Sequence, residues 1–448
     1  MAKKNLIIDT NVFLSDSDCF EKFENNDLFV PIKVLEELDK HKTRQDSVGF
    51  HARQSIKKFD ALRTQGTLSK GVKLGKGLGV LRFVKAEEIA IDELPMGLSH
   101  NSSDHLVLAA ALAVKNLDPK KKCIVVSQDV NMRVIADALG LLTEDYASSQ
   151  VVHSRDVIYE GFVKMLVDDV EIDEFYAKQD VWLYEEDAAE QKIVLHPNEF
   201  VMLVSIENEK KTALGRFIDW NTPLKPLKTQ KDDIFSWGVK PKNKEQKCGL
   251  DLLLDDDIPF VSLIGRAGSG KTLMAMLAGL EQVLGLEKGK YKKIIVSRPV
   301  QPLGKDIGFL PGTMEEKMAP WMKPIFDNME YIMGSDRTML DLYIQKGVIE
   351  IDAITYIRGR SISNAYVIID EAQNLTAHEV KTILTRVGEN TKIVLTGDIE
   401  QIDNIYTNET SNGLTYAVEK FKHSHLAGHI TFKKGERSKL ATEASKLL

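Results

Sequence analysis

The fold of the C-terminal half is decided by eight consecutive residues that fit the pattern GxxxxGK[ST] in full. They are Gly265, Arg266, Ala267, Gly268, Ser269, Gly270, Lys271 and Thr272. A strand-like apolar run at 259–264 precedes them, and a helix-like run at 273–283 follows. Glycines let backbone N–H groups face phosphate oxygens, and the start of a helix adds a favourable dipole. The stretch predicts a nucleotide site with Lys271 at the β- and γ-phosphates and Thr272 on Mg²⁺; a glycine-rich turn with an exposed lysine is the simpler alternative.

Two further buried strands are predicted to end in polar residues. The run 365–369 leads into Asp370 and Glu371, and a later apolar run leads to Asp398 and Gln401. In a nucleotide site, Asp370 would hold Mg²⁺ through water and Glu371 would orient the attacking water. Asp398 and Gln401 would sense the γ-phosphate, although by themselves they also fit a turn after a strand. Three such strand ends in one sheet favour an NTPase.

From about 242 to 448, the chain resembles the PhoH family of ATPases, whose core is similar to the first motor domain of superfamily-one helicases. The resemblance is carried by the glycine-rich loop, by Asp-Glu-Ala-Gln at 370–373 and by Gly-Asp-x-x-Gln at 397–401. It implies that ATP is the nucleotide. It also implies that a glutamine upstream of the loop reads adenine, a position that Gln246 matches loosely.

The PhoH resemblance further implies an arginine finger near the C-terminus. Arg437 is the first choice, with Arg360 and Arg386 as alternatives, and each of the three also fits an ordinary surface ion pair. The chain holds a single phosphate loop and ends soon after Arg437, which leaves no room for a second motor domain. The finger is therefore expected from a neighbouring subunit, in a homo-oligomeric ring that is most simply a hexamer.

Acidic residues follow strand-like runs or open a helix in the N-terminal third. They are Asp9, Glu36, Glu37, Asp104 and Asp129. In a parallel sheet, carboxylates at such places converge on one crevice, and four like charges there need a cation. Oxygen ligands without His or Cys select Mg²⁺ or Mn²⁺, and a pair of these ions can hydrolyse a phosphodiester. Singly, each acid also fits a turn or a solvated charge, and Asp104 fits a helix cap.

Over about 4–146, the order and setting of these acids resemble the PIN-domain ribonucleases, most recognisably at Ile8-Asp9-Thr10-Asn11. The resemblance implies that Asp9, Glu37, Asp104 and Asp129 are the metal ligands. Asn11 and Ser127 would orient them. Glu37 is preferred to Glu36 because the family's acid directly precedes a leucine, here Leu38.

The alternation of strand and helix patterns predicts an α/β protein in three parts. These are a PIN-like parallel-sheet domain at 1–146, a small β-rich connecting domain with a linker at 147–241, and a P-loop ATPase domain of RecA-like fold at 242–448. The segment 64–79 is expected to be a flexible surface excursion. Four strands of a sheet or barrel are expected in the middle part, at 181–184, 193–195, 201–206 and 213–218.

A PIN domain ahead of a PhoH ATPase resembles the bacterial PIN-PhoH proteins, which implies an ATP-dependent RNA helicase coupled to an endoribonuclease. The residues alone indicate only a metal-dependent phosphodiesterase site and an NTPase. One alternative is an ATP-gated nuclease that does not unwind, and another is an inactive N-terminal site that only binds RNA or a partner. RNA rests on the resemblance, with DNA as the alternative substrate. The expected RNA contacts are Lys305, Lys317, Trp321, Lys323, Arg358 and Arg360.

Composition and apolar runs exclude several other classes of protein. The 448 residues carry 59 basic and 66 acidic side chains, so nucleic-acid binding must use local patches rather than bulk charge. The longest apolar run, 106–114, is far shorter than the roughly 18 residues of a membrane span. With no secretory segment and three scattered cysteines, the protein is expected in the cytoplasm, with the cysteines as small core residues. An antitoxin-like regulator is conceivable, because many PIN nucleases have one.

Overall fold

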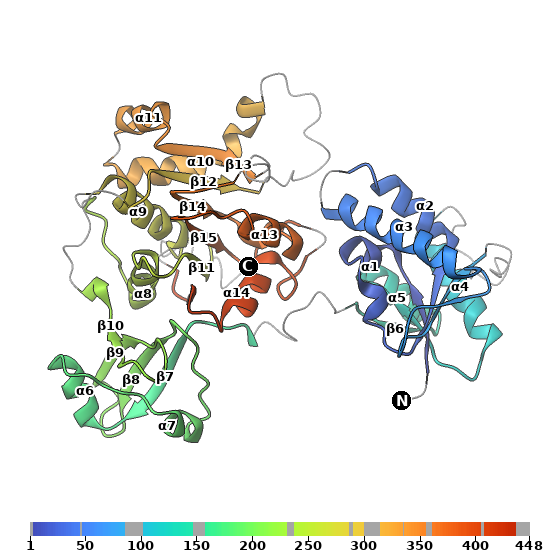
Figure 1. Ribbon diagram of the computed structural model, residues 1–448, viewed down its shortest axis with the longest axis horizontal. Coiled ribbons are helices and arrows are strands. Elements are labelled where there is room, and N and C mark those ends of the chain that lie inside the picture. Colours follow the sequence, from blue (N-terminus) through green and yellow to red (C-terminus); the bar gives the residue numbers. More distant parts are fainter. Residues whose placement is uncertain are drawn as a thin grey trace. The chain divides into compact units, whose positions relative to one another are not determined.

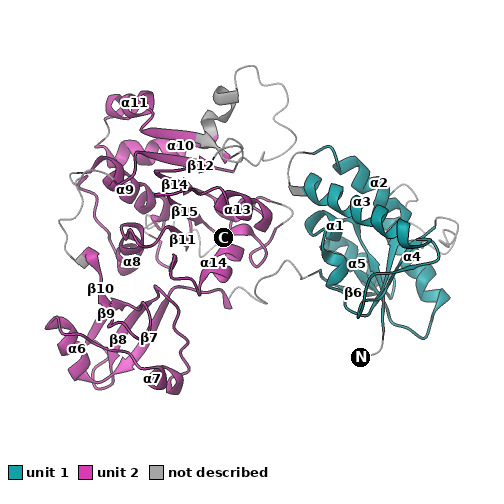
Figure 2. Ribbon diagram, viewed as in Figure 1, with its two compact units in different colours: residues 1–150 teal, residues 151–448 magenta. Residues whose placement is uncertain are grey.

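The computed structural model describes ten stretches of the chain (Figure 1). They are residues 3–44, 47–85, 102–146, 157–230, 237–285, 290–299, 314–334, 336–354, 361–404 and 407–435. The chain divides into two compact units, residues 1–150 and residues 151–448 (Figure 2). The expected middle and C-terminal parts lie together in the second unit, and their separation into two domains stays a prediction. None of the helices in these stretches has both the length and the apolar character needed to cross a bilayer.

Unit 1 is built on a six-stranded sheet in the order β3-β4-β2-β1-β5-β6. All neighbouring strands are parallel except the edge pair β3 and β4. The strands are β1 (Asn5–Ile8), β2 (Asp27–Pro31), β3 (Val72–Lys73), β4 (Val80–Val84), β5 (Cys123–Val126) and β6 (Leu142–Glu144). The helices are α1 (Thr10–Ser15), α2 (Ile32–His41), α3 (Ser47–Gln65), α4 (Ser103–Leu117) and α5 (Val130–Ala138), with a 3-10 turn at Cys19–Glu21.

The parallel sheet expected for the N-terminal part is confirmed, and β1 and β5 are buried along their whole length, as an internal parallel strand requires. One detail differs. The segment 64–79 is not all loop, because α3 runs to Gln65 and β3 adds an antiparallel edge strand beside β4. Val72 is buried there, and Gly71 supplies the positive φ of 103° that the turn into β3 needs. The glycine and lysine content of this segment obscured its short strand.

Unit 2 begins with a four-stranded sheet in the order β10-β9-β8-β7. The strands are β7 (Phe162–Val167), β8 (Phe200–Ser205), β9 (Thr212–Arg216) and β10 (Lys225–Pro226). The pair β7 and β8 is parallel and the other pairs are antiparallel. Between β7 and β8 the chain forms α6 (Asp169–Tyr176) and α7 (Glu185–Glu190), as a parallel crossover requires, and a 3-10 turn lies at Lys228–Gln230.

Two of the four strands expected in this part are confirmed, as β8 and β9. The strands expected at 181–184 and 193–195 are wrong, because neither segment pairs in the sheet. Their side chains do alternate, with Val181 and Leu183 buried and Trp182 and Tyr184 exposed. This alternation comes from an extended connection packed on one side of the sheet, which gives the same sequence pattern as a half-buried strand.

The second sheet of unit 2 has six parallel strands in the order β13-β12-β14-β15-β11-β16. Its strands are β11 (Phe260–Gly265), β12 (Lys293–Arg298), β13 (Ile349–Ala353), β14 (Ala365–Ile369), β15 (Lys392–Gly397) and β16 (Ala427–Phe432). Its helices are α8 (Lys244–Leu253), α9 (Lys271–Leu284), α10 (Met314–Ile332), α11 (Arg337–Gln345), α13 (Ala377–Leu384) and α14 (Gly413–Phe421), with a 3-10 turn at Ala372–Asn374.

The strands β11, β14 and β15 are fully buried and lie side by side in the middle of this sheet. The three motifs predicted at strand ends therefore emerge at one edge of the sheet, where ligands of parallel α/β sheets bind. The mixed α/β class and the C-terminal P-loop fold are as expected. The three cysteines are buried and free, as predicted for core residues.

The two sheets of unit 2 are joined by a buried ion-pair cluster. Arg216 of β9 is 1% exposed; its guanidinium pairs with Asp251 of α8 at 3.2 Å and with Asp255 just beyond that helix. Burial alone would raise the pKa of Asp255, but Arg216 holds it well below its usual range. The side-chain amide of Asn198 also donates to the main-chain oxygens of His425 and Ala427. These contacts hold the small sheet to the six-stranded sheet.

Candidate active sites

The glycine-rich loop connects β11 to α9 with the geometry expected of a phosphate loop. Gly268 and Gly270 have positive φ angles of 78° and 88°, a conformation that a side chain would disfavour. The Ser269 N–H donates to the Arg266 carbonyl at 3.1 Å, which closes the turn, and Gly270 is the N-cap of α9. The loop therefore aims the N-terminus of α9 at the edge of the sheet.

Lys271 is the most informative side chain of the loop. It is 7% exposed, yet its ammonium group has no hydrogen bond or ion pair with any residue that the structure describes. Its place at the start of α9 suits an anionic ligand, because this cation and the N–H groups of the helix start attract the same phosphate. A glycine-rich turn with an exposed lysine, the simpler alternative, does not describe this residue.

The residues predicted to hold Mg²⁺ are brought together. The Thr272 hydroxyl donates to Oδ1 of Asp370 at 2.7 Å, and the Thr396 hydroxyl donates to the same oxygen, also at 2.7 Å. Asp370 is 5% exposed. An oxygen-only pair of this kind suits Mg²⁺, which usually keeps several waters and takes few protein ligands. The sequence did not single out Thr396, although its place at the end of β15 was a usable signal.

Glu371, the predicted water-orienting residue, directly follows Asp370 and has a left-handed backbone with φ of 53°. Its Oε1 lies 2.9 Å from the Arg298 guanidinium, and its Oε2 accepts from the Gln373 amide at 2.6 Å. The Gln373 amide also donates to the Gln401 main-chain oxygen, and its carbonyl accepts from the Asp398 N–H. Gln373 thus links the two strand ends. Sequence reasoning gave no role to Gln373 or Arg298.

The predicted sensor residues contact the site in different ways. Asp398 is 3% exposed and accepts the Ala267 N–H at 2.8 Å, so it braces the phosphate loop. Gln401 has an exposed side chain and contacts its neighbours through its main chain. Arg266 is exposed and pairs with Glu400 at 3.0 Å. Contact of Asp398 and Gln401 with a γ-phosphate stays a prediction.

Gln246 lies in α8 against the phosphate loop and is 3% exposed. Its amide donates to the Ser269 carbonyl at 2.9 Å, and its carbonyl accepts the Lys242 N–H at 2.7 Å. A Cβ on Gly270 would meet this amide at 2.8 Å. The contacts give Gln246 a role in supporting the loop; recognition of adenine stays a prediction.

In unit 1, Asp9 is the N-cap of α1 and lies at the end of β1. It is 5% exposed, and it accepts from the Thr10 N–H at 2.6 Å and from the Ser127 hydroxyl at 2.7 Å. Asn11 donates to the same hydroxyl at 3.0 Å and accepts the Gln128 N–H. Asp9 therefore contacts Ser127, and Ser127 contacts Asn11; these are the two residues predicted to orient the acid.

The structure separates the two adjacent glutamates. The Glu37 carboxylate accepts a short hydrogen bond from the Thr10 hydroxyl, next to Asp9. The Glu36 side chain is 57% exposed and pairs with Lys33 at 2.5 Å. Only Glu37 points to the crevice, because α2 turns the two neighbours to different faces.

Electrostatic interactions connect Asp9 with the other predicted acids. Burial raises the pKa of Asp9 to about 7, against the hydrogen bonds from Ser127 and Thr10, and the charges of Asp104 and Glu37 raise it further. The pKa of Asp104 is raised by partial burial, then by Asp129 and Glu37. Asp129 is the N-cap of α5 and accepts the Asn131 N–H at 2.7 Å. Charge interactions therefore connect Asp9 with Glu37 and Asp104, and Asp104 with Asp129, while shared binding of a metal ion by the four stays a prediction.

Their arrangement is loose. Within the described stretches, no three Asp, Glu, His or Cys side chains surround one point closely enough to bind an ion together. The donor set still fits a hard cation, since Asp9 and its acidic neighbours supply only oxygen atoms and repel one another. Asp9, Glu37, Asp104 and Asp129 would hold it. A cation would remove the repulsion that raises the pKa of Asp9.

Several predicted residues lie outside the described part of the chain. They are Arg437, Lys305, Arg358 and Arg360, together with the side chain of Lys317. Of the remaining nucleic-acid candidates, Trp321 is partly buried and Lys323 is exposed, both on α10. Arg386, an alternative finger, is exposed just beyond α13.

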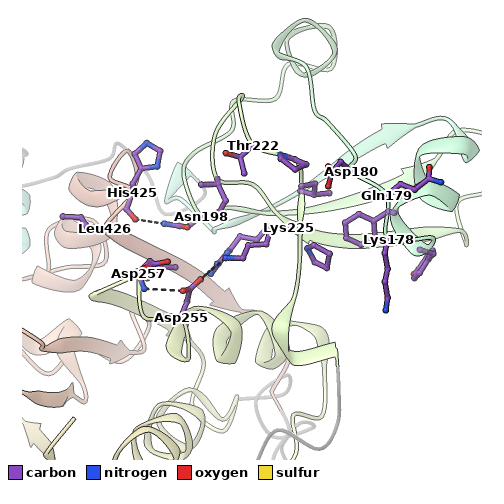
Figure 3. A pocket seen from close by; sticks show the side chains of 18 residues that line it. Lys178, Gln179, Asp180, Asn198, Thr222, Lys225, Asp255, Asp257, His425 and Leu426 are labelled. Atoms are coloured by element: carbon purple, nitrogen blue, oxygen red, sulfur yellow. Dashed lines mark hydrogen bonds and ion pairs between the residues drawn. The ribbon is translucent and has the colours of Figure 1, made fainter. Parts of the chain in front are cut away.

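A cavity of about 790 Å³ lies apart from both sites, between the small sheet and the six-stranded sheet of unit 2 (Figure 3). Figure 3 shows Lys225 directed at Asp255, with 3.6 Å between their charged groups, and Asn198 bonded to His425. The lining mixes acidic, basic and apolar side chains, so no single class of ligand is indicated. None of the predicted site residues lines this cavity.

Comparison with known proteins agrees with both halves of the chain. Residues 6–147 match the PIN domain family, and residues 238–447 match the family described as PhoH-like protein. Protein PhoH2 of Bacillus subtilis (strain 168) is 43% identical over 99% of this chain and 100% of that protein. Protein PhoH2 of Mycolicibacterium smegmatis is 33% identical over 100% of this chain and 97% of that protein.

Among solved structures, the UvsW helicase from bacteriophage T4 aligns with 68% of this chain and 77% of that chain. The identity is 12% and the TM-score is 0.26, a likeness too weak to carry weight.

Proposed function

The chain belongs to the PhoH2 family, with an N-terminal PIN domain and a C-terminal PhoH domain, and we propose that it is an ATP-dependent RNA helicase coupled to a metal-dependent endoribonuclease. The observation that carries the ATPase half is the place of Lys271, a largely buried residue at the start of α9 with no side-chain partner in the described part of the chain, beside the bonded pair Thr272 and Asp370. The nuclease half is supported by the contact of Asp9 with Ser127 and by the acids around them.

In the ATPase site, the backbone of the glycine-rich loop and Lys271 would bind the phosphates. Thr272 and Asp370 would hold Mg²⁺, which neutralises charge on the phosphate oxygens. Glu371 would accept a hydrogen bond from the attacking water, and Gln373 would pass the state of the 397–401 segment to Glu371 through its two bonds. Arg437 of a neighbouring subunit would complete the site, in a ring that is most simply a hexamer.

In the nuclease crevice, buried Asp9 and its three acidic partners would hold Mg²⁺ or Mn²⁺, the ion that activates water for phosphodiester hydrolysis. Ser127 would orient the Asp9 carboxylate, because its hydroxyl donates to Asp9 and accepts from Asn11. RNA is proposed as the substrate from the family resemblance, and the strand freed by the ATPase would be the one that is cut.

The test uses a 5′-labelled RNA duplex with a single-stranded tail, and the matching DNA, with Mg²⁺ and with or without ATP. Native gels measure strand release and denaturing gels measure cleavage. Lys271→Ala should abolish release and leave cleavage of single strands, and Asp9→Asn should do the opposite. Cleavage that depends on ATP without any strand release would show an ATP-gated nuclease in place of the proposed helicase. A preference for the DNA substrates would contradict RNA as the substrate.

Oligomeric state is tested separately by light scattering on the full-length protein with ATP and Mg²⁺. A ring predicts a mass of several chains. A monomer that hydrolyses ATP at the full rate would refute the arginine finger from a neighbour.

A further inference from the structure

Arg298 ends β12 and connects two elements that sequence reasoning treated separately. One guanidinium nitrogen lies 2.9 Å from Oε1 of Glu371, and another donates to the Trp321 main-chain oxygen in α10 at 3.3 Å. The ion pair is well shielded, with the two side chains 22% and 24% exposed. The guanidinium therefore spans from the predicted catalytic glutamate to α10.

The same contacts restrain Glu371. Its Oε1 is paired with Arg298 and its Oε2 with the Gln373 amide, so both oxygens already have donors. A carboxylate that orients an attacking water must turn an oxygen to that water and keep its basicity, and a bound guanidinium opposes both. Glu371 as the structure shows it is held back from that role.

Two prolines lie in the turn of α10 that Arg298 touches. Pro320 and Pro324 flank Trp321, and each proline lacks the N–H that would bond to the preceding turn. The exposed Lys323 lies in the same turn. An anionic strand bound at Lys323 would contact the same turn whose Trp321 carbonyl accepts from Arg298.

We propose that Arg298 is a positioning residue that restrains Glu371 until a nucleic-acid strand engages the Pro320–Pro324 turn of α10, which then draws the guanidinium away and frees the glutamate. This inference rests on the proposed function, since it takes RNA as the ligand of α10. Arg298 couples strand binding to ATP hydrolysis through its contacts with Glu371 and with the Trp321 carbonyl.

The test is steady-state ATP hydrolysis by the full-length protein, with Mg²⁺, without and with poly(U) RNA. Arg298→Ala should raise the basal kcat roughly threefold or more, leave the KM for ATP unchanged, and shrink the stimulation by poly(U). Arg298→Lys keeps the positive charge but cannot bridge both partners. Its basal kcat should therefore lie between those of the unmodified protein and Arg298→Ala. Arg337→Ala is the matched control, because it removes an exposed arginine paired with Glu330 in the same sheet unit.

Thermal melting of Arg298→Ala and Arg298→Lys shows whether each variant is folded. A basal kcat that falls or does not change in a folded variant overturns the restraint, and so does undiminished stimulation by poly(U). If the unmodified protein hydrolyses ATP but ignores poly(U), the coupling to RNA fails with the proposed function. The basal rate of Arg298→Ala then decides the restraint by itself.

Discussion

The hydroxyl of Thr272 donates to Oδ1 of Asp370 at 2.7 Å, which ties the first turn of α9 directly to the end of β14. One hydrogen bond thus joins two motifs whose residues are 98 positions apart in the sequence. Thr396 donates to the same carboxylate oxygen from β15. Two hydroxyl groups therefore hold the Asp370 carboxylate in place before nucleotide and Mg²⁺ bind.

Thr272→Ala should lower kcat/KM for ATP at least roughly tenfold and raise the Mg²⁺ concentration needed, because it removes both a predicted ion ligand and the bond to Asp370. Thr272→Ser keeps the hydroxyl and should stay close to the unmodified protein. Thr396→Val removes only the supporting bond, so its effect should be smaller. Steady-state hydrolysis across a Mg²⁺ series measures all three, and equal effects of Thr272→Ala and Thr396→Val would contradict the assignment.

Glu37 and Glu36 form a matched pair for testing the nuclease crevice. Glu37→Gln should reduce cleavage of a labelled single-stranded RNA by roughly a hundredfold or more, since it removes a predicted ion ligand beside Asp9. Glu36→Gln changes the same charge on the exposed face and should cleave at the normal rate. A loss with Glu36→Gln and none with Glu37→Gln would reverse the assignment.

Gln246→Ala separates support of the phosphate loop from recognition of adenine. Because the Gln246 amide bonds the Ser269 carbonyl, its loss should loosen the loop and raise the KM for ATP and for GTP by a similar factor, on the order of three- to tenfold. Competition between the two nucleotides measures the ratio. If the preference for ATP collapses while GTP is unaffected, Gln246 reads the base.

The buried His429 should make stability depend on pH. Burial lowers the pKa of His429 to about 3, while Ser262 and Tyr159 act in the opposite direction. Below about pH 6.5 the unfolded chain takes up a proton that the folded chain refuses, so this residue costs stability as pH falls from 6.5 to 3. The expected slope is about 1.4 kcal/mol for each pH unit.

Urea unfolding of the protein and of His429→Gln, at several pH values from 4 to 7, isolates that slope. The unfolding free energy of the unmodified protein minus that of the variant should fall by about that slope as the pH is lowered from 6.5 to 4. Burial also raises the pKa of Glu199 to about 7, which acts in the opposite sense but is common to both proteins and cancels in the difference. Parallel curves would show that His429 does not titrate as its burial requires.

Prediction from sequence worked where a motif dictates backbone geometry. Gly268 and Gly270 are needed for positive φ, and the strands that precede Asp9 and Asp370 are mostly apolar because they are buried along their whole length. Such signals are local, so they could be read without knowing the fold. The choice of Glu37 rested instead on the family resemblance, in which the acid precedes a leucine, and Leu38 is buried in the core.

The features of the fold and of the sites that the sequence did not predict depend on contacts between residues that are distant in the sequence. Arg298 meets Glu371 across 73 positions of sequence, and Thr10 gains its importance only from Glu37 on the next helix. Gln246 resembled a base-reading residue, but the fold places its amide against Ser269. In the middle part, Val181 and Leu183 alternate with exposed residues without pairing, so periodicity alone could not separate packing from a β-ladder.

The Arg216 cluster sets where this protein can be cut. A fragment starting at Lys242 would contain every ATPase motif, yet it would discard the guanidinium that faces Asp251 and Asp255. Burial already raises the pKa of Asp251, and Asp255 raises it further, so the pair would be left as mutually repelling acids beside the core. The smallest fragment expected to fold as the PhoH domain therefore begins upstream of its motifs, at the small sheet, and motif boundaries are a poor guide to truncation.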